Sequence, residues 1–158
     1  MKQKNLFLLV GVPGSGKSYF CNKKIAENKN TIHISRDEIR FSMLGEDENY
    51  FAQEAKVFEC FAEQVQKAID SIEYTDIYVD ATHLNPKGRE KILDCLDLSN
   101  VNIIPIVFHT PLATCISRNN NREGRAKVPS SVIRRMYFSL KNPTLDEKYK
   151  YKKIIEVS

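Results

Sequence analysis

The residues with the clearest chemical meaning lie near the start of the chain, in a glycine-rich stretch. Positions 11–18 read Gly-Val-Pro-Gly-Ser-Gly-Lys-Ser, which matches the spacing GxxxxGK[ST]. Glycines in this pattern let backbone N–H groups turn inward around a phosphate, and the following helix adds positive potential at its start. Lys17 can then reach the β- and γ-phosphates, and the Ser18 hydroxyl can bind Mg²⁺. An apolar run precedes the stretch and a helical pattern follows it, so it predicts a nucleoside-triphosphate site rather than a chance turn.

The identity of the bound nucleotide can be inferred by elimination. GTPases with this loop usually carry the motifs DxxG and NKxD, and neither occurs in the chain. We therefore expect ATP, together with Mg²⁺. The candidate nucleotide-binding residues around the loop are Gly11, Pro13, Gly14, Ser15, Gly16, Lys17, Ser18 and Tyr19.

A second candidate site follows the next apolar run, where positions 35–40 read Ser-Arg-Asp-Glu-Ile-Arg. Ser35 and Glu38 have the spacing of a capping box, which would only start a helix. Asp37 and Arg40 are three residues apart and share a helix face. On that face, a carboxylate can take a proton from an attacking hydroxyl, and an arginine can hold a phosphate or carboxylate of the acceptor. The capping and the catalytic interpretation can both hold, because Ser35 and Glu38 would form the cap, whereas Asp37 and Arg40 would contact the acceptor.

A third stretch, Asp-Ala-Thr-His-Leu-Asn-Pro at 80–86, follows the apolar residues 77–79. A carboxylate that ends a buried strand is the usual place for a residue beside Mg²⁺, which favours Asp80 as a metal-binding residue over a helix cap. Asn85, just before a proline, is the better cap. Thr82 is a candidate for binding the acceptor. His83 either faces the substrate or lines the loop.

A fourth stretch is basic and polar. Residues 118–135 contain six arginines or lysines and one acidic residue, whereas the whole chain has a net charge of only +4. Near a triphosphate loop, such a segment is typical of a lid that closes over the nucleotide, although a solvated basic face would look the same. The expected lid spans 118–128, and its candidate nucleotide-binding residues are Arg118, Arg122 and Arg125.

Short β-rich runs and longer helical patterns alternate along the chain and must position these residues. Strands are expected at 6–10, 31–34, 77–79, 101–108 and 153–157. Helices are expected at 17–27, 36–44, 48–72, 86–96, 112–118 and 129–140. This alternation predicts an α/β fold with a mostly parallel five-stranded sheet between two helical layers, and a helical or loop lid. Ligands bind at the carboxyl ends of such strands, where all four stretches would meet.

Composition sets outer limits on these expectations. The chain has 158 residues with 42% hydrophobic and 28% charged residues, which fits a single folded domain over 1–158. Its four cysteines are scattered, as is usual for thiols in a reducing compartment. No run approaches the length of a membrane span. We therefore expect a cytoplasmic protein without a membrane partner, while its oligomeric state is not indicated.

Together, the four stretches resemble the P-loop kinases typified by the phage polynucleotide 5′-kinase, within the wider group of P-loop ATPases and zeta-toxin-like kinases. The matching pieces are GVPGSGKS at 11–18, SRDEIR at 35–40, DATHLNPKGR at 80–89 and the lid at 118–129 that leads into residues 132–137. The resemblance implies a P-loop fold, with ATP and Mg²⁺ bound by Lys17 and Ser18. It also implies that Asp37 is the general base and that Arg40 grips the 3′-phosphate of the acceptor nucleotide.

The resemblance further implies that Arg122, together with Arg118 and Arg125, contacts the ATP phosphates. This makes Lys17, Asp37 and Arg122 the candidate catalytic residues. The lid holds one residue more than in the phage kinase, which leaves Arg122 and Arg125 as alternatives, and Asp80 lies one position earlier. The leading hypothesis is transfer of the γ-phosphoryl group of ATP to the 5′-hydroxyl of an RNA or DNA end. The alternatives are a nucleoside or another small hydroxyl acceptor, and an ATPase or switch module without an acceptor.

Overall fold

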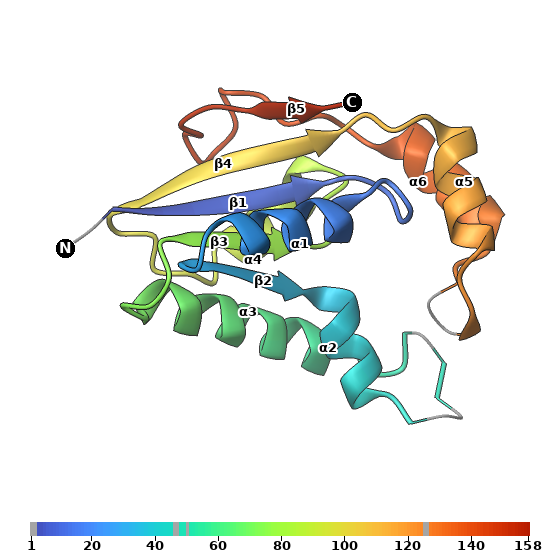
Figure 1. The fold of residues 1–158 in the computed structure, drawn as a ribbon, viewed down its shortest axis with the longest axis horizontal. Helices are drawn as coiled ribbons and strands as arrows, with labels where there is room; N and C mark the ends of the chain where they lie inside the picture. Colours follow the sequence, from blue (N-terminus) through green and yellow to red (C-terminus); the bar gives the residue numbers. More distant parts are fainter. Residues whose placement is uncertain (1–2, 46–47, 50, 125–126) are drawn as a thin grey trace.

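Five parallel strands form one sheet in the order β2–β3–β1–β4–β5 in the computed structural model, which describes residues 3–45, 48–49, 51–124 and 127–158 (Figure 1). The strands are β1 Lys4–Val10, β2 Thr31–Ser35, β3 Asp76–Asp80, β4 Val101–Phe108 and β5 Ile155–Val157. The helices are α1 Lys17–Glu27, α2 Arg36–Met43, α3 Glu54–Asp70, α4 Pro86–Leu93, α5 Leu112–Asn120 and α6 Ser130–Ser139. The α/β fold and the parallel sheet predicted from the sequence are confirmed.

The central strand β1 shows why the protein has three layers. Side chains alternate between the two faces of a strand. Leu6 and Leu8 face one core cluster, which contains the buried residues of α3 and α4. Leu9 faces a second cluster on the opposite side, where Cys21 of α1 is buried. Helices α5 and α6 instead lie beyond the carboxyl ends of the strands (Figure 1).

The helix expected over 48–72 is shorter, and its buried face is different. It begins at Glu54 and ends at Asp70. The apolar spacing that predicts the longer helix runs from Phe51 to Ile72, but these two side chains are 64% and 99% exposed. The N–H of Phe51 donates to the side chain of Asn49 at 2.7 Å, so a local turn precedes the helix. The residues that α3 buries against the sheet are Val57, Phe61, Val65, Ala68 and Ile69.

The strand ends bring the candidate residues to one side of the molecule. The loops after β1, β2, β3 and β4 all leave from the carboxyl edge of the sheet, because the strands are parallel. Within the described ranges, no helix has both the length and the apolar character needed to cross a membrane.

Candidate active site

The loop between β1 and α1 has the backbone that a phosphate cradle needs. Gly14 and Gly16 have φ angles of 83° and 100°, in the left-handed region that favours glycine. A Cβ on Gly14 would also lie only 2.5 Å from the carbonyl oxygen of Cys115 in α5. Gly14 therefore serves two purposes: it permits the turn and lets the loop pack directly against the backbone of α5.

Lys17, at the start of α1, folds back over this loop. Its Nζ donates to the carbonyl oxygens of Gly11 at 2.8 Å and Val12 at 3.1 Å. Burial lowers the pKa of Lys17, while Asp80 and Asp37 raise it and Arg122 lowers it. The charges of all three residues thus act at the Lys17 ammonium, so the start of α2, the end of β3 and the segment after α5 meet at the P-loop.

Ser15 supplies an independent sign that the loop is built to hold a ligand. Its side chain is 3% exposed, and among the described residues its Oγ has no hydrogen-bond partner. A buried hydroxyl without a partner is costly unless a ligand or water satisfies it. The loop thus fits the phosphate groups of a nucleotide.

Ser18 and Asp80 form a pair that fits Mg²⁺. The Ser18 hydroxyl donates to Oδ2 of Asp80 at 3.2 Å, and His33 Nε2 lies 2.7 Å from the same oxygen. Burial would raise the pKa of Asp80, but the His33 hydrogen bond and the Lys17 charge bring it below its usual value. Asp80 is therefore an anion at neutral pH. One hydroxyl and one carboxylate are enough, because Mg²⁺ beside a nucleotide takes its other ligands from water and phosphates.

The described residues offer no larger metal cage: they contain no cluster of three or more His, Cys, Asp or Glu side chains.

Asp37 and Arg40 contact each other, as their spacing on α2 predicts. The Arg40 guanidinium donates to Oδ1 of Asp37, and its Nε donates to Oε1 of Glu54 at 2.7 Å. Arg40 is only 5% exposed, whereas the Asp37 side chain is 47% exposed. Ser35 caps α2 by accepting from the N–H of Glu38 at 3.2 Å, so capping and the acidic–basic pair coexist. Sequence analysis missed Glu54, which comes from α3.

The loop after β3 is held in place from two sides. The N–H of Gly11 donates to the carbonyl of Thr82 at 3.1 Å, and Nδ1 of His83 lies 2.6 Å from the Leu9 carbonyl oxygen. A carbonyl only accepts, so Nδ1 carries the proton. Burial lowers the pKa of His83 to about 4, which leaves the ring neutral at pH 7. The ring therefore supports the loop while His83 also lines the cleft, so both interpretations of this residue stay open, and its backbone takes a φ of 46°.

The expected lid begins in α5 and ends before α6. Arg118 donates to the Gly14 carbonyl at 3.3 Å, and Arg122 follows in the turn just after the end of α5. Arg118, Arg122 and Lys127 line the same cleft as the P-loop. Arg125 falls outside the described residues, so the structure places Arg122 but leaves its alternative undecided.

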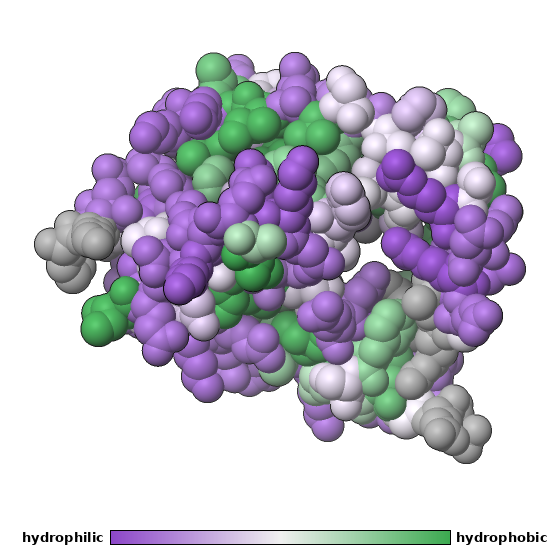
Figure 2. All heavy atoms as spheres, in the orientation of Figure 1, coloured by the Kyte–Doolittle hydropathy of each residue, from purple (hydrophilic) through white to green (hydrophobic). Residues whose placement is uncertain are grey.

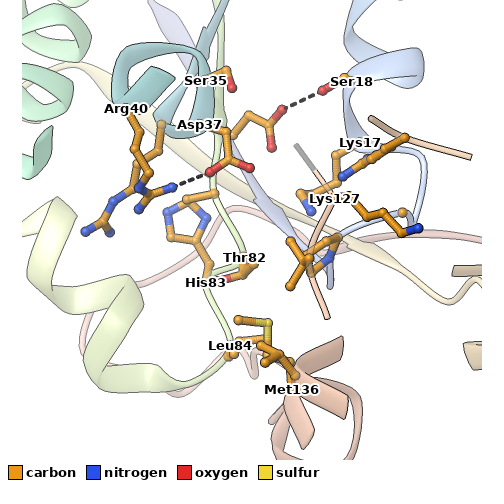
Figure 3. A pocket seen from close by; sticks show the side chains of 18 of the residues that line it. Lys17, Ser18, Ser35, Asp37, Arg40, Thr82, His83, Leu84, Lys127 and Met136 are labelled. Carbon is orange, nitrogen blue, oxygen red and sulfur yellow. Dashed lines mark hydrogen bonds and ion pairs between the residues drawn. The ribbon is translucent and has the colours of Figure 1, made fainter. Parts of the chain in front are cut away.

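Most of these groups line one cleft of about 1070 Å³, whereas Gly11, Ser15 and His33 lie behind its lining. Figure 2 shows it as a hollow on the side where α5 and α6 stand opposite α2. In the close view, Lys17 and Ser18 lie on one side, Asp37 and Arg40 on another, and Leu84 and Met136 form an apolar end (Figure 3). The cleft has room for a nucleotide and a second, small molecule side by side, because ligand pockets typically span roughly 300–1,000 Å³.

Both the fold and the phosphate loop define a P-loop protein of the kinase-like type. A family model described as an AAA domain matches residues 6–143, and the chain belongs to this family.

Solved structures show the same fold at low sequence identity. A chain in the Pnkp1/Rnl/Hen1 RNA repair complex matches with a TM-score of 0.74 and 23% identity, over 89% of this chain and 45% of that one. A fungal RNA kinase matches with a TM-score of 0.71 and 12% identity, over 100% and 77%. A gluconokinase from Sinorhizobium meliloti 1021 matches with a TM-score of 0.58 and 18% identity, over 99% and 83%. This chain thus spans less than half the length of the RNA repair chain. At these low identities, the similarity to the three structures concerns the fold alone.

Proposed function

We propose that the protein is an ATP-dependent kinase that phosphorylates the 5′-hydroxyl of a polynucleotide end. One observation carries the proposal: a single cleft holds the phosphate loop together with a half-exposed carboxylate, Asp37, whose charge acts on Lys17. A switch or ATPase without an acceptor has no use for this carboxylate. The RNA repair and RNA kinase names of two proteins with this fold support a nucleic-acid acceptor.

In the proposed reaction, the acceptor hydroxyl oxygen forms a bond to the γ-phosphorus of ATP, and the bond from this phosphorus to the bridging oxygen of ADP breaks. Asp37 accepts the hydroxyl proton, and help of this kind contributes roughly 10²–10⁴ to a rate. Lys17 turns from the loop carbonyls toward the phosphates. Arg118 and Arg122 stabilise the negative charge on the transferring group, and an arginine in this role is worth on the order of 10³–10⁵ in related phosphoryl transfers.

Ser18 and Asp80 would hold Mg²⁺, which when bound neutralises charge on the phosphate oxygens. His33 keeps the Asp80 carboxylate in position through its 2.7 Å hydrogen bond. Thr82, beside His83, lines the cleft and can contact the acceptor. Arg40 would bind a phosphate on the acceptor.

A second candidate function is phosphorylation of a small hydroxyl compound. It is favoured by one observation: Arg40 is 5% exposed and already bound to two carboxylates, so its availability for an acceptor phosphate is limited. One of the proteins with this fold is a gluconokinase, whose name points to a small acceptor.

Transfer of label from γ-labelled ATP tests the proposal. The acceptors are matched 5′-hydroxyl RNA and DNA oligonucleotides, a 3′-phosphorylated mononucleoside and gluconate. We expect labelling of oligonucleotide ends by the wild type and none above background by Asp37→Asn, which should bind ATP with unchanged affinity. Transfer to gluconate or nucleosides alone would establish the second candidate. Label on oligonucleotides with Asp37→Asn at the wild-type rate would show that another group is the base.

Residues 1–158 would act as one kinase domain, because the described strands all join one sheet around one cleft. A cytoplasmic location stays a prediction from the scattered cysteines.

A further inference from the structure

Asn119, near the end of α5, is a buried polar side chain that none of the sequence motifs includes. It is 0% exposed, and both ends of its amide are bonded to the backbone of one residue, Val128. The Val128 N–H donates to Oδ1 of Asn119 at 2.9 Å, and Nδ2 of Asn119 donates to the Val128 carbonyl. The side chain thus joins the two ends of the segment 120–127, in the way one strand pairs with another.

Both anchors of this clamp are fixed to the phosphate loop. Val128 packs against the cluster of Val12, Cys115 and Ile133. Asn119 lies one helical turn after Cys115, whose carbonyl oxygen would be 2.5 Å from a Cβ on Gly14. The base of the lid therefore cannot shift without moving the loop that would hold the phosphates.

Arg122 lies three residues after Asn119, next to the clamp. Its N–H donates to the Asn119 carbonyl at 3.0 Å, which extends the backbone of α5 to the arginine. Further along, the N–H of Lys127 donates to the Gly124 carbonyl at 3.2 Å, and no described atom lies within 4 Å of a Cβ built on Gly124. The described contacts that fix Arg122 in the cleft thus lie at the base of the segment.

We propose that Asn119 is a positioning residue for Arg122. The inference rests on the proposed function for its catalytic meaning, because Arg122 is taken to stabilise the transferring phosphoryl group. By closing the segment at its base, Asn119 limits the conformations from which Arg122 must reach the γ-phosphate. It acts without contacting ATP: Asn119 does not line the cleft, whereas Arg118 and Arg122 do.

A double-mutant cycle on turnover tests the proposal. Asn119→Ala should lower kcat about 10- to 100-fold, the usual cost of misplacing a catalytic group, and change the KM for ATP less than about threefold. In an Arg122→Ala background, the same change should alter kcat by less than about twofold, because residues that act through each other are not additive. If the fold-losses in kcat from Asn119→Ala and Arg122→Ala instead multiply in the double variant, the two residues act independently and the proposal is overturned.

The neighbouring Asn120 provides a matched control, since it is exposed on the same helix. Asn120→Ala should keep wild-type kcat, and a loss equal to that of Asn119→Ala would also overturn the proposal. Thermal melting confirms that each variant is folded. If the alanine variant does not fold, Asn119→Asp retains the size of the side chain and its bond from the Val128 N–H, and should lower kcat in the same direction.

Limited trypsin digestion gives a readout that needs no acceptor. Release of the clamp should speed cleavage after Arg122 in Asn119→Ala relative to the wild type and Asn120→Ala, at a temperature where all three are folded. An unchanged cleavage rate would overturn the clamp. The double-mutant cycle of Asn119 and Arg122 is also measured on the rate of ADP release by the protein without an acceptor. If oligonucleotides never stimulate ADP release, the polynucleotide function fails, while the cleavage rates and the basal cycle still decide the role of Asn119.

Discussion

Glu54 binds Arg40 and Arg36 at once. Its Oε1 accepts from Arg40 Nε at 2.7 Å and its Oε2 from an Arg36 nitrogen at 3.0 Å. Burial would raise the pKa of Glu54, but the hydrogen bond and charge of Arg40, and those of Arg36, bring it below its usual value. A carboxylate of this chain therefore occupies the guanidinium that an acceptor phosphate would use. The Glu54 carboxylate and an acceptor phosphate must therefore either compete for the Arg40 guanidinium or bind it together.

Competition leads to a prediction for Glu54→Gln. Removing the Glu54 charge makes the electrostatic potential around Arg40 more positive, so the KM for a 3′-phosphorylated acceptor should fall about fivefold, the value of a partly exposed ion pair. An acceptor without the phosphate should show no such gain, and steady-state kinetics with the matched pair measures both. A higher KM for the phosphorylated acceptor would mean that Glu54 orients Arg40 rather than competing for it.

Gly14→Ala should disable the phosphate loop. The new Cβ would approach the Cys115 carbonyl to 2.5 Å, at a backbone φ of 83° that disfavours alanine. We expect ATP affinity to fall about tenfold or more, since the left-handed backbone alone costs about 1–2 kcal/mol. Fluorescent-nucleotide titration measures this. Gly45→Ala, where the nearest described atom to a Cβ is Oε1 of Glu48 at 3.4 Å, is the control and should bind ATP normally.

His83 should make folding stability depend on pH. Burial lowers its pKa from 6.5 to about 4, so the unfolded chain binds the proton more readily between these values. The contribution of His83 to the free energy of unfolding should therefore have its full value above pH 6.5. It should fall by about 3 kcal/mol as the pH drops to 4. Asp80, whose pKa is lowered from 3.8, contributes mainly below this window.

His83→Asn checks the source of this dependence, since asparagine tolerates the backbone φ of 46°. Urea unfolding at pH 7.5, 6 and 5 should give a flatter profile for the variant than for the wild type. Parallel profiles would assign the dependence to other groups.

Glu147→Gln should destabilise the fold far more than loss of a surface pair. Arg89 is 0% exposed, and its Nε and NH2 bind Glu147 at 3.1 and 3.0 Å. Removing one partner of a buried pair costs about 3–5 kcal/mol. Urea unfolding should show this loss, whereas Asp94→Asn, which breaks an exposed pair with Lys148, should change little. Equal losses would mean that Arg89 finds another partner.

Sequence patterns predicted the framework well, because local periodicity dictates it. The helix over 17–27 has the predicted bounds, and the segments after β1, β2, β3 and β4 meet at one cleft as the parallel sheet requires. Glu54 escaped prediction because its contact with Arg40 joins two helices whose crossing no local pattern records. Asn119 looked like part of a polar loop, since nothing in its neighbours indicates a bond to Val128. The error in the helix at 48–72 arose because exposed Phe51 and Ile72 happened to continue the apolar spacing.

The neutral His83 ring offers a spectroscopic use. Its Nδ1 lies 2.6 Å from the carbonyl oxygen of Leu9, to which it donates, two residues before the phosphate loop begins. Such a short, buried bond slows exchange with water and moves the proton resonance downfield, away from the crowded amide region. The chain has only three histidines, so substituting His33 and His109 in turn would assign the signal. Nucleotide titration followed at this single resonance would then report movement at the root of the phosphate loop without any attached label.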